Sequence, residues 1–135
     1  MTETRTLGNS LAELPPILGW LEAVLRGAGV AAAIVGELRL IAGEGLSNVI
    51  RHGYADSTRH SIEVTLKIGG GEVQLVLRDD GQPFNPLAAP AQDPHNPIVE
   101  RAGGWGIHLR QSLVDRADYR REGNANVLYL IKRSE

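Results

Sequence analysis

The sequence predicts an α+β protein, a two-layer α/β sandwich whose helices cover one face of a mixed, mostly antiparallel sheet. Two observations support this prediction. Segments with a helical hydrophobic period and segments with a two-residue alternation follow one another along the chain. Their order is strand, two helices, two strands, a long loop, a helix and two strands, and such an order packs into one layer of helices and one of strands.

The N-terminal segment is predicted to form one strand and one helix. Residues 3–8 have the character of a short strand. Ser10, followed three residues later by Glu13, forms a capping-box pattern that marks a helix start. A proline pair ending at Pro16 complicates that start, because proline is best tolerated in the first helical turn, so the helix is alternatively placed near Pro16. Its apolar residues recur at helical spacing until Gly27.

The middle of the chain is predicted to contain a long helix and a hairpin. Apolar residues with a period near 3.6 form one stripe over about residues 31–51, which indicates an amphipathic helix. Residues 61–68 and 72–77 alternate between apolar and polar and are predicted as strands. The three glycines at 69–71 between them are typical of a hairpin turn, so these strands are expected to be antiparallel with one buried face.

The C-terminal part begins with a segment that has no regular period. Residues 82–102 contain five of the seven prolines, and a loop of that length inside a compact domain is most often a lid or a binding loop. A helix is predicted over about 106–115. Two closing strands, roughly 117–122 and 126–132, are separated by the turn residues Gly123-Asn124.

The composition limits the possible classes of function. The chain has 135 residues, 42% of them apolar, which fits one domain with a real core. Its net charge is -2, and with two Trp, three Tyr and one Phe it lacks the basic, aromatic surface of a nucleic-acid platform. It has no cysteine, no signal-like N-terminus and no apolar run long enough to span a bilayer. We expect a soluble cytoplasmic protein, a single domain over 1–135, that binds neither nucleic acid nor membrane.

The long helix carries Glu44, Asn48 and His52 at successive i, i+4 positions, so the three side chains line one stripe. A solvated polar edge is the simpler interpretation. However, Gly43 and Gly45 flank the glutamate, and a glycine inside a helix costs up to about 1 kcal/mol relative to alanine. A backbone or ligand that approaches closely would explain this cost, and an Asn amide oxygen is a suitable ligand for magnesium.

Two glycine-containing motifs follow. Asp79-Asp80-Gly81 ends the second alternating strand, and Asp-Gly is also ordinary turn chemistry. Gly103, Gly104 and Gly106 precede the next predicted helix, where backbone N–H groups and the helix dipole favour phosphate oxygens. A flexible hinge would explain these glycines equally well, so each motif by itself is a weak signal.

In this order, Glu44-x-x-x-Asn48, Asp79-x-Gly81 and Gly104-x-Gly106 resemble the N, G1 and G2 boxes of the GHKL ATPases, which share the Bergerat ATP-binding fold. Within that superfamily, the run from Glu44 to Tyr54 and the motif Arg101-x-Gly-Gly-x-Gly106 are similar to those of the bacterial anti-sigma factor serine/threonine-protein kinases. The resemblance extends from about residue 30 to the C-terminus.

The resemblance implies a role for each motif. Glu44 would be the general base that activates the attacking hydroxyl, and Asn48 would be the protein ligand to Mg²⁺. Asp79 would accept a hydrogen bond from the adenine amino group, and Gly81 would let the chain pass close to the ring. The implied cofactors are ATP or ADP with Mg²⁺. The residues assigned to nucleotide binding are Asn48, His52, Asp79, Gly81, Phe84, Arg101, Gly103, Gly104, Trp105, Gly106 and Ile107.

The chain departs from the family pattern at several positions. Pro83 replaces the second glycine of the G1 box, and the expected ATP lid, about 83–102, is short and rich in proline. The Gly-Thr pair often found near the last strand is absent, and Asn126 is a possible substitute for that threonine. Three further histidines are interpreted as incidental: His60, His95 and His108.

The resemblance implies a partner-switching function. The chain would phosphorylate a serine of a small anti-sigma-factor antagonist of the STAS type, would bind a sigma factor or similar target, and would pair as a homodimer. Two other functions remain open. The chain could be a nucleotide-binding switch module that transfers no phosphate, although the retained Glu44 argues against it. It could also be a detached catalytic domain of a histidine kinase, although the short lid argues against that.

Overall fold

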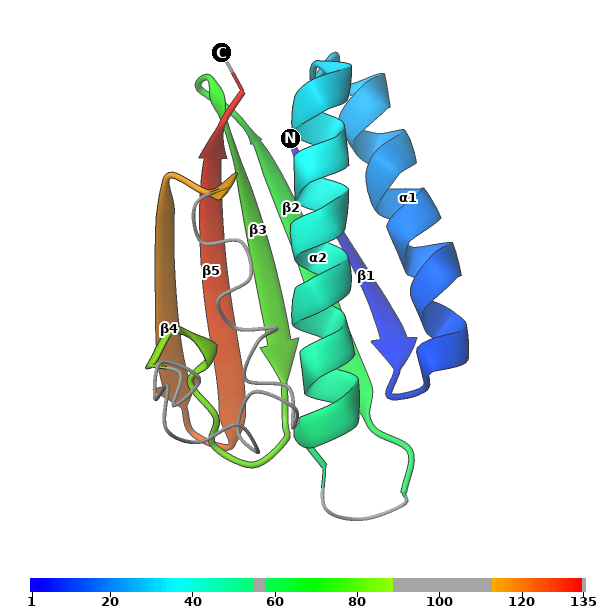
Figure 1. The fold of residues 1–135 in the computed structure, drawn as a ribbon, viewed down its shortest axis with the longest axis vertical. Helices are drawn as coiled ribbons and strands as arrows, with labels where there is room; N and C mark the ends of the chain where they lie inside the picture. The colour runs from blue at the N-terminus through cyan, green and yellow to red at the C-terminus, as the bar shows by residue number, and fades with distance from the viewer. Residues whose placement is uncertain (55–57, 89–112, 135) are drawn as a thin grey trace, which may run out of the picture.

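The computed structural model of the chain describes residues 1–54, 58–88 and 113–134. They form a five-stranded sheet and two long helices (Figure 1). In chain order the elements are β1 (Thr2–Gly8), η1 (Leu11–Glu13), α1 (Leu14–Gly27), α2 (Ala32–His52), β2 (Ser61–Gly69), β3 (Glu72–Asp79), η2 (Pro86–Ala88), β4 (Arg116–Glu122) and β5 (Ala125–Arg133). No helix in this part of the chain is long and apolar enough to cross a membrane.

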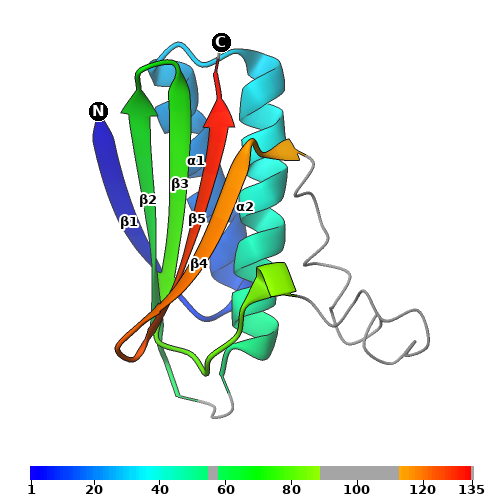
Figure 2. The same cartoon turned by 90° about the vertical axis from the view of Figure 1, so that its left-hand side faces the viewer.

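The strands lie in the order β1-β2-β3-β5-β4, and every neighbouring pair is antiparallel. Both long helices pack on the same face of the sheet, as the two perpendicular views show (Figures 1 and 2). The predicted α+β class and its two layers are therefore confirmed. Within the described residues the sheet is antiparallel throughout, so the expected parallel component is not observed.

Glycines close both hairpins. Gly70 and Gly71 connect β2 to β3 with φ values of 62° and 77°, and Gly123 connects β4 to β5 with a φ of 62°. These left-handed backbone angles are open to glycine and strained for most other residues. The turns fix the register within the β2–β3 and β4–β5 hairpins. The separate pairing of β3 with β5 places Asp79 directly opposite Asn126.

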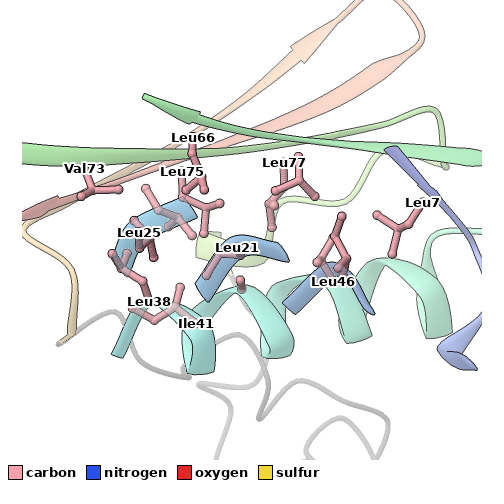
Figure 3. Close-up of a cluster of buried hydrophobic side chains, with 14 of the residues drawn as sticks. Leu7, Leu21, Leu25, Leu38, Ile41, Leu46, Leu66, Val73, Leu75 and Leu77 are labelled. Atoms are coloured by element: carbon pink, nitrogen blue, oxygen red, sulfur yellow. The ribbon is translucent and has the colours of Figure 1, made fainter. Parts of the chain in front are cut away.

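The core lies between the sheet and the helices, where leucines from both layers meet (Figure 3). The alternation predicted for β2 and β3 is observed, because every second residue of each strand is buried except Ile68, which is partly buried. The helical stripes of α1 and α2 supply the other side of the core. The largest side chains with almost no exposure include Leu21, Leu25, Leu38, Leu46, Leu66, Leu75 and Leu77.

The first helix starts differently from the predicted capping box. Ser10 Oγ accepts the Ala12 N–H at 3.3 Å and caps the short 3₁₀ turn η1. Glu13 does not reach back to Ser10; its carboxylate accepts the Gly8 N–H at 2.9 Å and so holds the end of β1. The α-helix begins at Leu14, with both prolines in its first turn, where a missing N–H costs no helical hydrogen bond.

Part of the predicted C-terminal half lies outside the described residues. The lid segment is described only as far as residue 88, where a short 3₁₀ turn follows Phe84. The helix predicted over 106–115 falls outside the described residues as far as 112. Its last two residues were assigned wrongly, because Val114 and Asp115 form a bend that leads directly into β4. The predicted hairpin of β4 and β5 is confirmed.

Packing explains one of the two glycines that flank Glu44. A Cβ added at Gly45 would come within 2.9 Å of Leu77 Cδ1, closer than real Cβ contacts allow. A Cβ at Gly43 would make an ordinary contact of 3.4 Å with Leu18 of α1. The absence of a side chain at Gly45 therefore lets α2 lie close against β3, which explains the cost of a glycine inside the helix.

We predict opposite effects of alanine at two glycines of α2. Gly36→Ala should raise the free energy of unfolding by about 0.5–1 kcal/mol, because its Cβ meets nothing within 4 Å and alanine favours the helix. Gly45→Ala should lower it by about 1 kcal/mol, because the overlap with Leu77 outweighs that gain. Urea unfolding of both variants measures the difference. Equal stabilisation by the two changes would contradict the close packing of α2 on β3.

Candidate functional site

The predicted stripe on α2 is present and its central residue is buried. Asn48 is only 6% exposed, while Glu44 and His52, one turn to either side, are half-buried. The Asn48 Nδ2 has no hydrogen-bond partner among the described residues. A buried amide without a partner costs free energy, so it usually marks a strained or functional position. The oxygen and nitrogen of an Asn amide are assigned by their partners, so this side chain can present its oxygen as a hard ligand. The residue fits the predicted Mg²⁺ position.

The end of α2 is fastened to the loop after β3. The Gln82 backbone N–H donates to the Gly53 carbonyl oxygen at 2.8 Å, and Gln82 Nε2 donates to the His52 carbonyl oxygen at 2.9 Å. A Cβ added at Gly81 would overlap the same Gly53 oxygen. The absence of a side chain at Gly81 therefore lets the loop lie against the end of α2. These contacts hold the α2 stripe and the β3 end at one end of the molecule.

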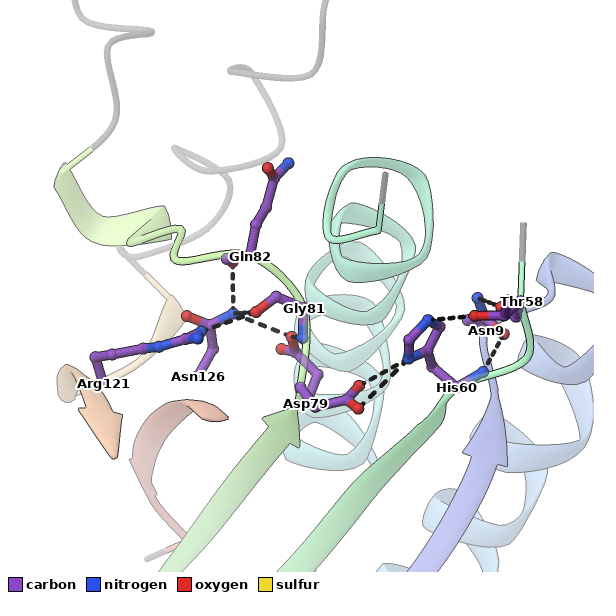
Figure 4. Close-up of polar contacts among 9 residues, drawn as sticks. Asn9, Thr58, His60, Asp79, Gly81, Gln82, Arg121 and Asn126 are labelled. Carbon is purple, nitrogen blue, oxygen red and sulfur yellow. Dashed lines mark hydrogen bonds and ion pairs between the residues drawn. The ribbon is translucent and has the colours of Figure 1, made fainter. Parts of the chain in front are cut away.

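Asp79 ends β3 as a buried carboxylate. It is 6% exposed, and its Oδ1 accepts two hydrogen bonds, from the Gly81 N–H at 2.8 Å and from Asn126 Nδ2 at 3.1 Å (Figure 4). Within the described residues, Oδ2 accepts none. The carboxylate is thus held by one oxygen, and the other is available to a ligand that brings a hydrogen-bond donor.

The electrostatics of Asp79 are dominated by its burial. Burial raises the pKa of the carboxyl group, because the charged form loses its water. The hydrogen bonds from Asn126 and Gly81 act in the opposite direction, the charge of Asp80 adds to the rise, and the charge of Arg121 reduces it. The site therefore keeps a costly buried charge at the position where the adenine amino group is expected.

The β4–β5 hairpin contributes residues that motif comparison did not assign. Asn126, the possible substitute for the missing threonine, is 6% exposed and contacts Asp79 directly. Arg121 Nη1 donates to the Gly81 carbonyl oxygen at 2.8 Å, and the Tyr119 hydroxyl donates to Asn126 Oδ1. Alternation along a strand would have placed Tyr119 and Arg121 on one face, but their contact with the Asp79 loop needed the register of the sheet.

A second polar cluster lies beside Asp80. The rings of Tyr54 and His60 stack with centroids 4.3 Å apart, and His60 Nδ1 lies 3.2 Å from the Asp80 carboxylate. Burial raises the pKa of Tyr54, and the charges of Asp79 and Asp80 raise it further. His60 was interpreted as incidental from its place before a strand, and the fold brings it next to the Asp79 loop.

The remaining predicted site residues divide into two groups. The Phe84 backbone N–H donates to Asn126 Oδ1 at 3.3 Å, so Phe84 belongs to the Asp79 side of the site. The half-buried His52 side chain is on the α2 stripe, while its carbonyl receives Gln82. The others lie outside the described residues: Arg101, Gly103, Gly104, Trp105, Gly106 and Ile107, with His95 and His108.

Comparison with known proteins places this geometry in context. The family model described as histidine kinase-like ATPase domain matches residues 7–132. The chain is similar to the serine/threonine-protein kinase BtrW of Bordetella bronchiseptica, with 26% identity over 98% of this chain and 94% of the relative. It is also similar to the serine-protein kinase RsbW of Oceanobacillus iheyensis, with 25% identity over 70% of this chain and 63% of the relative.

The fold is also found in a solved structure. The crystal structure of the RsbU and RsbW domains of Rv1364c from Mycobacterium tuberculosis superposes with a TM-score of 0.72. The match covers 98% of this chain and 32% of that chain, at 19% identity. At that identity the likeness shows the fold alone. It agrees with the predicted α+β architecture, in which helices cover one face of a mostly antiparallel sheet.

We predict that Asp79→Asn stabilises the nucleotide-free protein. The amide oxygen can still accept from Gly81 and Asn126, and the buried charge is removed. Because the folded-state pKa of Asp79 is raised, its favourable protonated form is present at low pH and is lost as pH rises through that pKa. The variant should therefore melt above the wild type at pH about 7, and the gap should close near pH about 4. Thermal melts across that range test the sign, and a gap that widens in acid would contradict it.

Proposed function

The chain belongs to the histidine kinase-like ATPase domain family, and we propose that it is a protein kinase that transfers the γ-phosphate of ATP to a serine of another protein. One observation carries the proposal: the Gln82 contacts hold the Glu44–Asn48 stripe of α2 at the same end of the fold as the buried acceptor Asp79. The names of the relatives, both serine kinases, support the same activity.

Nucleotide binding would use both sides of this site. Asp79 Oδ2, which no hydrogen bond occupies among the described residues, would accept from the exocyclic amino group of adenine. Asn48 would turn its amide oxygen toward the phosphates and hold Mg²⁺ there. When bound, Mg²⁺ neutralises charge on the phosphate oxygens during transfer. The predicted phosphate contacts from residues 101–107 would complete the site.

Glu44 would act as the general base for transfer. It lies one helical turn before Asn48, so its carboxylate is close to the position assigned to the phosphates. As the serine oxygen forms its bond to the γ-phosphorus, the bond to the β–γ bridging oxygen breaks, ADP leaves and the hydroxyl proton passes to the Glu44 carboxylate. The products are phosphoserine and ADP.

The position of Glu44 suits an acceptor on a macromolecule. Besides facing the Asn48 side of α2, this residue lines an open groove of about 620 Å³ between α1 and α2, together with Leu18, Leu40 and Arg51. The Glu44 side chain therefore borders the outer surface of the helical layer, with its Oε2 buried. A hydroxyl on a protein segment can approach it there without entering the interior of the domain.

The partners are proposed on the resemblance to the anti-sigma serine kinases. We propose a small antagonist of the STAS type as the phosphorylated protein, a sigma factor or similar target as the second partner, and a homodimer in the cytoplasm as the working form. The relatives named RsbW, and the structure that joins an RsbU domain to an RsbW domain, support a partner-switching role.

We predict micromolar, Mg²⁺-dependent binding of ATP and ADP, measured by calorimetry. Asn48→Ala should weaken binding about tenfold or more and reduce its Mg²⁺ dependence, because the buried amide is lost. Asp79→Asn should weaken it about as much in the presence or absence of Mg²⁺, because an amide N–H then faces the adenine amino group. Ser47→Ala, beside Asn48 on the half-exposed side of α2, is the control and should bind as the wild type does. No binding by the wild type at millimolar nucleotide would overturn the kinase proposal.

We predict that Glu44→Gln slows phosphotransfer to a candidate antagonist by about 10²–10⁴-fold while ATP affinity stays within about threefold. Glu63→Gln, at an exposed position of β2, should retain full activity. The labelled phosphate should survive acid, as phosphoserine does. An acid-labile product would instead indicate a histidine kinase domain. Normal ATP binding with no transfer to any antagonist tried would favour a nucleotide-binding switch module.

A further inference from the structure

A buried asparagine lies at the centre of the polar contacts behind Asp79. Asn126 Oδ1 accepts two hydrogen bonds, one from the Phe84 backbone N–H at 3.3 Å and one from the Tyr119 hydroxyl. Its Nδ2 donates to Asp79 Oδ1 at 3.1 Å, to the Gln82 carbonyl oxygen at 2.9 Å and, more weakly, to the Gly81 carbonyl oxygen at 3.4 Å. This one side chain connects the end of β3 to the loop that follows it (Figure 4), and the Tyr119 hydroxyl connects it to β4.

These partners determine which way the Asn126 amide points. A backbone N–H can only donate, so the atom that faces Phe84 must be the amide oxygen. Backbone carbonyl oxygens can only accept, so the atom that faces Gln82 and Gly81 must be the NH₂ group. Turning the amide over would place N–H against N–H on one side and oxygen against oxygen on the other. The NH₂ group is therefore held against Asp79.

The orientation of Asn126 in turn determines how Asp79 can titrate. Oδ1 of Asp79 meets two donors, the Asn126 NH₂ and the Gly81 N–H, so a proton on that oxygen would have no acceptor. Any proton that Asp79 binds must sit on Oδ2, the oxygen left for the ligand. Above its pKa, Asp79 offers the ligand an acceptor; below its pKa, it offers a donor.

We infer that Asn126, held by Tyr119, is a positioning residue that fixes Asp79 as a hydrogen-bond acceptor, and so sets both the base preference and the pH range of nucleotide binding. The inference rests on the proposed function, because it concerns the same pocket. It adds a role for the β4–β5 hairpin, which supplies no phosphate or metal contact in that proposal.

The charged and titratable groups around Asp79 come from each element that packs against it. Asp80 follows it in the chain and is paired with His60; Arg121 reaches the loop from β4; and Tyr54 lies just after α2. Burial and the Asp80 charge raise the pKa of Asp79, whereas the Asn126 hydrogen bond and the Arg121 charge lower it. Removing the Asn126 donor therefore moves the pKa further upward.

Binding of ATP and of inosine triphosphate together reports whether Asp79 Oδ2 carries a proton. Adenine carries an amino group, a donor, where hypoxanthine carries a carbonyl oxygen, an acceptor. Wild-type protein should bind ATP better as pH rises through the pKa of Asp79, and inosine triphosphate better as pH falls through it. Asn126→Asp keeps the shape of the side chain and replaces the NH₂ donor by an oxygen, so two carboxyl groups then face each other.

The experiment measures ATP and inosine triphosphate binding by calorimetry from about pH 5 to 8, with ¹³C NMR titration of the aspartates in nucleotide-free protein. In Asn126→Asp the Asp79 titration and the midpoint of ATP binding should both move up by about one pH unit or more. A shift of that size should lower the preference for ATP over inosine triphosphate about tenfold or more within the titration range. Tyr119→Phe should move the Asp79 titration and the ATP-binding midpoint upward by less than Asn126→Asp does, because the Phe84 N–H still holds the amide oxygen of Asn126. Tyr129→Phe is the control, because its hydroxyl contacts only Glu122 among the described residues, and it should shift neither.

The outcomes separate this inference from the proposed function. If the wild type binds neither triphosphate, both fail. If the wild type binds ATP and both Asn126→Asp and Tyr119→Phe leave the Asp79 pKa and the ATP preference unchanged, only the positioning role fails. A merely structural role for Asn126 would weaken both nucleotides equally at every pH, and that result would also overturn the inference.

Discussion

The site depends on how closely α2 lies on β3. Gly45 removes the side chain that would overlap Leu77, and the helix can then lie low enough for the Gln82 contacts to fasten its end to the loop after β3. This packing brings together groups that are more than thirty residues apart in the chain, Asn48 on the helix and Asp79 on the strand. Well-packed interiors shift little without cost, so the spacing of the two groups is a property of the core rather than of a mobile loop.

At Asp79, burial of the charge and the hydrogen bonds to the carboxylate have opposite effects on the free energy of the charged form. A carboxylate in a site from which water is largely excluded is unfavourable, and the raised pKa of Asp79 expresses that penalty. The hydrogen bonds from Gly81 and Asn126 offset part of it on one oxygen only. A fold selected for stability alone would favour a neutral side chain at this position. The buried charge is better explained as a group whose remaining hydrogen-bonding capacity is completed by a ligand.

The local pattern predicted most of the fold, and the motifs named the side chains that α2 and β3 contribute to the candidate site. Period and alternation gave the helices and the strands, because burial on one face imposes those repeats directly on the sequence. The capping-box prediction was wrong, because the Glu13 carboxylate accepts the Gly8 N–H instead of the Ser10 N–H. The local sequence pattern does not encode this contact across a turn. Local pattern does not join Tyr119 and Asn126 to Asp79, because the contact arises only when β5 pairs with β3, a strand more than forty residues away in the chain.

The departure at Asn126 shows why a missing family residue is a weak argument for a lost function. A threonine donates and accepts through one hydroxyl oxygen whose hydrogen can rotate, whereas an asparagine has a donor and an acceptor on separate atoms. In this chain the acceptor is occupied by Phe84 and Tyr119, so the donor has a single possible direction, toward Asp79 and the loop carbonyls. At this position the chain therefore holds an amide of fixed orientation. The amide satisfies one oxygen of Asp79, and it makes the behaviour of that carboxylate depend on the β4–β5 hairpin.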